Sequence, residues 1–471
     1  MVRVGAGAGA LLAVLGVTSS AEAQEWLKDR RYSEGSGVKT GDFEIHPGIA
    51  AEMGYDSNWF LRTDKDCKTP ANPTGGCLNG PPSAEVLAAG MLRVTPSLSI
   101  NSAQALQRTE GGPAPDPSVR FRAAVDATYR QFFGPQDVSR QSNLGGHANA
   151  RADILPGKPW GAAVFAGYTR TIQPQALGNP DASFNRSDIN AGIDLIAQPN
   201  SGTLDFKVGY AFYAALFEQS EGVPFTNYTH EISAGDRWKF TPRTSIFQDT
   251  QARFTTFPHA DRSVNFLNDS TPLKTRFGLN GLITSRISTL VAVGYGTTLA
   301  GNGSSPATRQ FDSVTAQAEG TFFLSPNPAS AEPGSVSLAL SSFTLGYSRD
   351  FSQSYFGNFY GSDKGYGKLS YFFAGKAILS LGASVSALQY PDVFVVPAKG
   401  APPVLGQTAF TNIFVSSTLF GEYRLTDAFG INATIDYGKM ISDVQLSQGG
   451  PLPFHLSWQR FQGFLGVRYF L

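Results

Sequence analysis

Charged side chains recur at alternating positions in several segments, which is the spacing that places them on one face of a β-strand. These residues are Arg120, Arg122, Asp126 and Arg130; Arg151 and Asp153; and Glu231, Arg237 and Lys239. Facing charges of this kind can form ion pairs and keep a channel hydrated. Because both signs occur, we expect a polar lumen crossed by salt bridges, without a strong field of one sign. The alternative is that the charges only hydrate and brace a wall.

No residue pattern typical of catalysis accompanies these charges. The sequence contains no HExxH, no GxSxG and no phosphate-binding glycine loop, and its histidines are scattered at His46, His147, His230, His259 and His455. By the alternation, His147 shares the face of Arg151, whereas His230 lies on the opposite face of its strand. A hydrolase assembled from distant strands stays an alternative. We expect no enzyme, no catalytic residue, no metal site and no cofactor.

The two cysteines are close together in the sequence. Cys67 and Cys77 flank a segment rich in proline and glycine that is typical of a surface loop. In an exported protein such a pair predicts one disulfide that closes the loop. A metal or redox role is less favoured, because no CxxC spacing or clustered histidine accompanies the pair.

The elements that must position the charges are β-strands with strict two-residue periodicity. Along residues 188–197, apolar Ile189, Ile193 and Leu195 alternate with Asp188, Asn190 and Asp194. Residues 203–212 and 429–438 repeat this design. A soluble β-sandwich would show the same alternation, so the pattern alone does not choose between a sandwich and a membrane barrel.

The number and spacing of the strands favour a barrel. We count about 18 candidate strands, the first near residue 43, the thirteenth near 334 and the last near 457. Short connections such as 241–243 and 286–288 alternate with long ones such as 258–272 and 301–310. Bacterial outer-membrane barrels have short periplasmic turns and long extracellular loops. The connections at 103–118 and 325–333 are long where this rhythm predicts short ones.

Composition agrees with a barrel and excludes other classes. The chain has 35 Phe, 17 Tyr and 51 Gly, but a mean hydropathy of -0.13 and no run of about 20 apolar residues that could form a transmembrane helix. Rings at the lipid boundaries and glycines at strand bends suit a barrel. The formal net charge is zero, which gives no electrostatic support for a nucleic-acid partner.

The two ends of the chain are consistent with export. Residues 1–23 have a basic start, an apolar stretch and a small-x-small site before Gln24, and predict a cleavable signal peptide. We therefore expect a periplasmic segment at 24–42 and an outer-membrane β-barrel at 43–471. In the last strand Leu465, Val467, Tyr469 and Leu471 alternate with more polar positions. Pairing of this strand with the first would remove every open edge.

Two apolar segments are candidates for binding. Residues 355–361 predict an aromatic extracellular loop in which Tyr355, Phe356, Phe359 and Tyr360 could stack on sugars or anchor a partner. The alternative is an aromatic girdle at the lipid boundary. The segment 391–410 could fold inward as a constriction or dock a partner protein, and the sequence favours neither.

The residues 43–62 carry a resemblance to a known family. Their pattern PxxxxxxGYDSNxF, from Pro47 through Gly54 to Phe60, resembles the start of porin-like outer-membrane barrels, including myxobacterial ones associated with polysaccharide export or gliding machinery. The last strand also resembles the signature read by the barrel-assembly machinery, except that Leu471 stands where phenylalanine is usual. Asp56, Ser57 and Asn58 are also typical of a turn that ends a strand.

Taken together, these features predict an all-β fold, a transmembrane antiparallel up-and-down barrel of about 18 strands in the outer membrane. Its expected function is a porin-like passage for polar solutes or exported polysaccharide. The alternatives are an occluded structural or adhesive barrel in a trans-envelope machine such as a gliding or surface-assembly complex, and a soluble secreted β-protein. Expected partners are outer-membrane lipid, the barrel-assembly machinery and possible saccharide or periplasmic envelope proteins.

Overall fold

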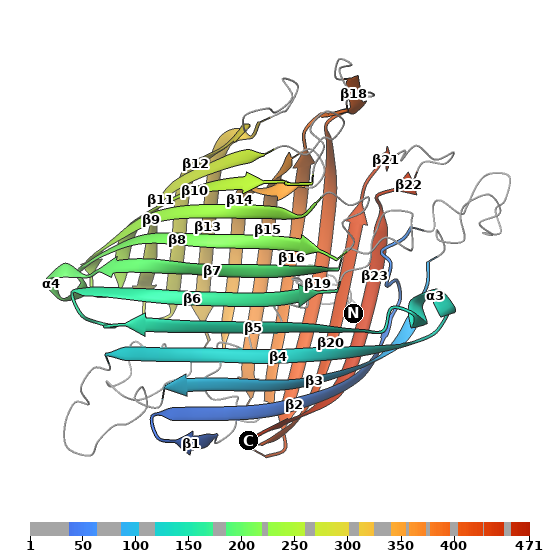
Figure 1. The fold of residues 1–471 in the computed structure, drawn as a ribbon, viewed down its shortest axis with the longest axis horizontal. Helices are drawn as coiled ribbons and strands as arrows, with labels where there is room; N and C mark the ends of the chain where they lie inside the picture. The colour runs from blue at the N-terminus through green and yellow to red at the C-terminus, as the bar shows by residue number, and fades with distance from the viewer. Residues whose placement is uncertain are drawn as a thin grey trace, which may run out of the picture.

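The computed structural model describes residues 37–63, 86–102, 118–172, 185–218, 225–259, 269–300, 310–324, 341–354, 358–373, 377–395, 404–426, 428–446 and 454–471. Within these ranges, eighteen strands form a closed antiparallel barrel (Figure 1). The all-β, up-and-down barrel expected from the sequence is confirmed. In the described part of the chain, no helix is long and apolar enough to cross a membrane.

The barrel strands follow one another in chain order, each pairing with the next. They are β2 (Phe43–Asp56), β3 (Ala89–Ser102), β4 (Val119–Phe133), β5 (Asn143–Ile154), β6 (Trp160–Thr171), β7 (Arg186–Ala197), β8 (Leu204–Phe217), β9 (Asn227–Thr241), β10 (Thr244–Thr256), β11 (Ser270–Thr284), β12 (Ile287–Ala300), β13 (Asp312–Phe323), β14 (Ser342–Ser354), β15 (Asn358–Phe373), β16 (Ala377–Tyr390), β19 (Phe410–Arg424), β20 (Phe429–Ile441) and β23 (Trp458–Phe470).

One strand starts later than its sequence predicts. The strand expected near residue 334 is β14, which begins at Ser342. Ser342 pairs with Phe323, the last residue of β13, and the Leu324 backbone N–H donates to the Ser341 carbonyl at 2.8 Å. Residues 325–340 lie outside the described ranges.

Pairing of the last strand with the first closes the barrel, as expected. The ladder between β2 and β23 runs from Gly48 opposite Phe470 to Asp56 opposite Gln462. The backbone N–H of Leu471 then donates to the Pro47 carbonyl, at 3.1 Å. Beyond that point β1 (Val38–Thr40) pairs with the start of β2 and continues the sheet along the line of β23.

The two faces of the wall differ as the alternation predicts. On β7, Ile193 and Leu195 are exposed on the outside, whereas Asp194 between them is buried on the inside. Large apolar side chains are exposed on the outer face of β8, β12, β20 and β23 in the same way. An apolar surface of this extent is unstable in water and suits a lipid phase. The wall is therefore that of a transmembrane barrel, and the soluble alternative is wrong.

The connections at the two rims are unequal. Short turns join β9 to β10, β11 to β12 and β19 to β20 at one rim, while the opposite rim carries two small hairpins. These hairpins are β17 (Val393–Val395) with β18 (Val404–Gln407), and β21 (Gln445–Leu446) with β22 (Phe454–His455). Figure 1 shows both hairpins beyond the ends of the barrel strands that they connect. Two short helices, α3 (Gln136–Ser139) and α4 (Pro199–Gly202), lie in other connections.

Candidate functional site

The nine charged residues expected to line the lumen all occupy inward strand positions. On β4, the outward Val119, Val125 and Tyr129 are exposed and alternate with the predicted set. The same holds on β5, where Leu144 and Ile154 are outward, and on β9, where Ile232 and Trp238 are outward. The inward set comprises Arg120, Arg122, Asp126, Arg130, Arg151, Asp153, Glu231, Arg237 and Lys239. His147 shares this face and lies 3.4 Å from Asp126, while His230 is outside and bonds Tyr210.

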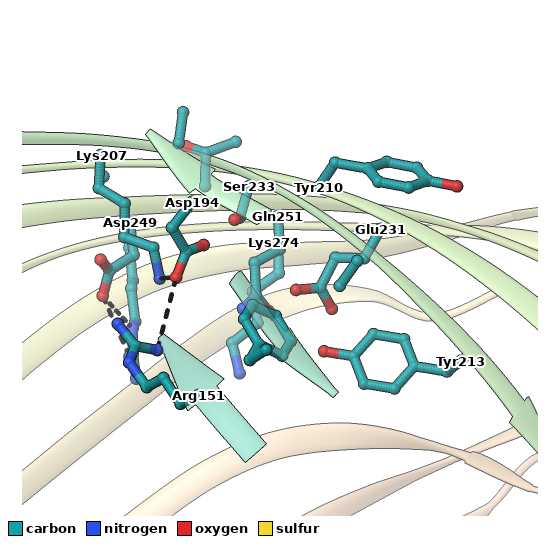
Figure 2. Close-up of a pocket in the computed structure, with 16 residues that line it drawn as sticks. Arg151, Asp194, Lys207, Tyr210, Tyr213, Glu231, Ser233, Asp249, Gln251 and Lys274 are labelled. Atoms are coloured by element: carbon teal, nitrogen blue, oxygen red, sulfur yellow. Dashed lines mark hydrogen bonds and ion pairs between the residues drawn. The ribbon is translucent and has the colours of Figure 1, made fainter. Parts of the chain in front are cut away.

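Five of the inward residues form a continuous chain of ion pairs across β4 to β8. Arg122 lies 3.8 Å from Asp153, which accepts a 2.7 Å bond from Arg151. Arg151 also reaches Asp194, at 3.9 Å, and Lys207 approaches the same carboxylate at 3.0 Å. Figure 2 shows this contact between Arg151 of β5 and Asp194 of β7 as a dashed line. Three cations thus share two carboxylates.

Small residues make this chain sterically possible. The strand register places Asp153, Ala163, Asp194 and Gly209 in one row across β5 to β8. Ala163 is fully buried, so Arg151 spans β6 above a methyl group to reach Asp194. A Cβ at Gly209 would lie 2.5 Å from Asp194 Oδ1, closer than van der Waals contact permits. Alanine and glycine at these two positions therefore leave the space that the ion pairs occupy.

Further ion pairs continue the polar wall from β8 to β14. Lys239 lies 3.0 Å from Asp205, Arg253 bonds Glu231 at 2.6 Å, and Arg276 lies 3.1 Å from Asp249. Lys274 pairs with Asp350 on β14. Ion pairs thus join neighbouring strands along the inner wall. Of the paired side chains, seven line a cavity of about 420 Å³ (Figure 2): Arg151, Asp194, Lys207, Glu231, Asp249, Lys274 and Arg276.

A second polar network joins the two ends of the chain, and we call it the seam. Glu52 on β2 pairs with Arg93 at 2.9 Å and accepts a 2.6 Å hydrogen bond from Asn432. Arg468 on β23 links Glu52, at 3.7 Å, to Glu422 on β19, at 3.4 Å. These side chains are largely buried. Sequence reasoning missed the seam, because its members are separated by hundreds of residues.

The motif GYDSN ends the first strand and fastens it to the last one; we call this contact the clasp and count it as part of the seam. The fully buried Asp56 accepts two bonds from Arg460, one of 3.1 Å from Nε and one of 2.5 Å from Nη2. Ser57 and Phe461 exchange two hydrogen bonds, at 2.9 and 2.8 Å. Asn58 donates 2.8 Å to the Gln459 carbonyl. The Asn58 backbone N–H also bonds Asp56, which confirms the expected turn.

After this turn the chain folds against the inner wall. Trp59 and Phe60 are buried with Met91, Phe132 and Phe464, and the rings of Trp59 and Phe132 lie 4.5 Å apart. Val138 of α3 packs in the same cluster. The inner face is therefore apolar beside the clasp and charged elsewhere. The pattern GYDSNxF that carries the family resemblance maps onto the clasp and this cluster.

The aromatic segment at 355–361 differs from its prediction. Phe359 and Tyr360 belong to β15 and do not lie in a loop, because the ladder with β14 continues to Ser354 opposite Asn358. Phe359 is buried against Phe311, with ring centroids 5.6 Å apart, and Tyr360 packs on Tyr390. The predicted loop is therefore wrong at these two residues, whereas their role in binding sugars or a partner stays a prediction. Tyr355 and Phe356 lie outside the described residues.

Other predicted features are placed as follows. The signal peptide at 1–23, Cys67 and Cys77 lie outside the described residues, so the expected disulfide stays a prediction. In the last strand Leu465, Val467, Tyr469 and Leu471 are all exposed on the outer face. The segment 391–410 contributes the β17–β18 hairpin. Among the described residues, no group of three or more His, Cys, Asp or Glu could hold a metal ion.

Comparison with known proteins gives matches only among solved structures. No protein-family model and no curated protein matches the chain. The barrel is similar to OccAB4 of Acinetobacter baumannii, with a TM-score of 0.43 and 11% identity over 92% of this chain and 99% of that one. It is also similar to OpdQ of Pseudomonas aeruginosa, with a TM-score of 0.42 and 12% identity over 91% and 98%. The barrel is similar as well to a mutant ferric enterobactin receptor of Pseudomonas aeruginosa, with a TM-score of 0.43 and 10% identity over 92% of this chain and 81% of that one.

Proposed function

We propose that this barrel forms a water-filled passage for small polar solutes across the outer membrane. The observation that carries the proposal is the contrast between its two faces. The outer face is apolar, whereas the inner face of β4 to β11 carries a series of ion pairs, and four of their cations line the cavity: Arg151, Lys207, Lys274 and Arg276. A barrel of 16 to 18 strands is also wide enough for an aqueous channel.

The passage needs no energy source of its own. Charged side chains that are paired within the wall stay hydrated and do not bind a solute irreversibly, which lets solutes leave as well as enter. Export of polysaccharide, attachment to a gliding or surface machine, and partner proteins stay predictions from the resemblance. The expectation that the chain is not an enzyme stays a prediction as well.

Conductance of the purified barrel in planar lipid bilayers tests the proposal. Protein extracted from membranes in detergent should give stable open steps, and liposomes that contain it should swell in small sugars and polyols but less in larger ones. A folded, heat-modifiable barrel that gives neither steps nor swelling would contradict the passage. That result would favour the structural or adhesive alternative.

A further inference from the structure

The ion pairs of the inner wall are asymmetric in exposure, although the formal charge of the chain is zero. The side chains of Arg122, Lys207 and Arg253 are 49%, 52% and 48% exposed. Their carboxylate partners Asp153, Asp194 and Glu231 are only 17%, 6% and 8% exposed. The same holds for the pair of Lys239 and Asp205, whose side chains are 43% and 21% exposed. In these four pairs, which span β4 to β10, the cation is more exposed than the acid; Arg186 and Asp188 at the start of β7 show the reverse order, with 27% against 36%.

Side-chain length explains the asymmetry. A carboxylate on one or two carbons stays at the level of the backbone, where neighbouring residues exclude water. Arginine and lysine place their charge at the end of a long stem and carry it towards water. Each pair is therefore a dipole whose positive end points into the lumen. Dissolved salt screens this charge beyond about 10 Å at 0.1 M ionic strength, so the cation acts on solutes that pass close to the wall.

The charge count adds to this orientation. In the chain from Arg122 to Lys207, three cations share two carboxylates, which leaves one positive charge without an equal partner. Arg237 is also exposed on the inner face, directly opposite Asp205, which already pairs with Lys239. The wall thus carries excess positive charge where its cations are most exposed.

We infer that this wall selects small anions, and we call Arg122, Arg151, Lys207, Lys239 and Arg253 the cationic strip. The inference rests on the proposed passage and adds its solute class, which is a small solute with a carboxylate or phosphate group. Arginine and lysine donate charge-assisted hydrogen bonds to both groups. The buried acids hold the cations in place without competing for the solute.

The strip ends at β10. At this border Asp249 of β10 is 43% exposed beside Arg276 of β11. Farther along, Asp350 of β14 is 43% exposed, whereas its partner Lys274 of β11 is only 23% exposed. Around the barrel, the inner wall therefore exposes mainly positive charge from β4 to β10, and exposed acids lie at and beyond the border of this region. Anions should follow the strip, and removal of a strip cation should matter more than removal of a cation elsewhere.

Reversal potentials of the barrel in a potassium chloride gradient test the inference. The parent should pass chloride more readily than potassium at low salt, and the preference should weaken at high salt. Lys207→Gln should lower the chloride-to-potassium permeability ratio. Because Asp194 keeps Arg151 as a partner, this variant should fold. Lys239→Gln repeats the test on a separate ion pair.

Arg243→Gln is the matched control. It removes one exposed positive charge from the turn between β9 and β10 and leaves the strip intact. Inorganic phosphate on one side should reduce the chloride current of the parent and of Arg243→Gln more than that of Lys207→Gln. A potassium-selective parent, or equal effects of Lys207→Gln and Arg243→Gln, would overturn the inference while leaving the passage. A parent without conductance would contradict the passage itself.

Discussion

The cations of the seam and those of the cationic strip are of the same type and have similar partners, but they differ in contact with water. Arg93 and Arg468 in the seam are 15% and 11% exposed, whereas Lys207 and Arg253 in the strip are 52% and 48% exposed. Arg93 also covers the Phe464 ring, at 3.5 Å, and Arg460 lies over Trp59. Seam cations are thus enclosed by rings and carboxylates.

This difference assigns the two regions separate tasks. A charge pair that is shielded from water is strong, and removal of one partner leaves the other unpaired at high cost. An exposed pair contributes little to stability, but its charge acts on whatever passes. The seam accordingly holds the first and last strands together, and the strip acts on solutes. Four substitutions test this division, in order of expected effect.

The largest effect should come from Arg460→Ala in the clasp. It leaves the fully buried Asp56 carboxylate without its cation, which costs about 3 to 5 kcal/mol for a buried pair. The free energy of unfolding, measured by urea titration in lipid vesicles, should fall by about this amount. The double variant Asp56→Asn with Arg460→Gln should regain part of the loss. A single variant as stable as the parent would remove the distinction between seam and strip.

A charge on the outside of the strip's own wall should have the next largest effect. Ile193→Arg places a cation in lipid, one residue away from the inward Asp194, and should cost about 2 to 4 kcal/mol near the bilayer midplane. Folding yield into vesicles, followed by the heat-dependent gel shift, measures the loss. Normal assembly would mean that the lipid face of β7 is assigned wrongly.

Filling the space beside Asp194 should have a moderate effect on stability. Gly209→Val would place a side chain against the Asp194 carboxylate and displace it from Lys207, at a cost of about 1 to 3 kcal/mol for an overpacked site. Unfolding in urea gives the cost. Gly365→Val is the control, since no heavy atom lies within 4 Å of a Cβ there. Equal losses would show that the open space beside Asp194 is not required.

The smallest effect on stability should come from Lys207→Gln in the strip. The Lys207 side chain is about half exposed, so we expect the free energy of unfolding to change by less than about 1 kcal/mol. Ion selectivity should nevertheless change, as described above. A stability loss as large as that of Arg460→Ala would place Lys207 in the same structural class as the seam and contradict the comparison.

Sequence reasoning could establish the fold because strand periodicity is local. The alternation of Ile193 with Asp194 assigns the two faces of one strand, and the same rule applied along the chain gives the strand number and the inward charges. It failed at Phe359 and Tyr360, where tertiary pairing extends a strand through residues that resemble a loop. The alternation of residues within one segment does not show which residues of a neighbouring strand pair with it.

The clasp and the exposure asymmetry could not be predicted in the same way. Asp56 and Arg460 meet only because the barrel closes, and their sequence separation hides the pair. The types of residue in Asp56, Ser57 and Asn58 indicated a turn but not its attachment to β23. Charges of both signs on the strand faces predicted a lumen without a strong field of one sign, whereas the depth of each charge in the wall depends on its neighbours, such as Ala163 and Gly209.

The central claim is that the inner wall lines a water-filled passage. Cysteine labelling of single open channels tests this claim most directly. A charged, membrane-impermeant thiol reagent should modify Lys207→Cys from the aqueous side and change its current in a single step. All variants are made in a Cys67→Ser, Cys77→Ser background, which has no thiol and should not respond. Ile193→Cys and Arg468→Cys should stay unchanged, because these positions face lipid or the closed seam. An inert Lys207→Cys, or a reactive Ile193→Cys, would contradict the account.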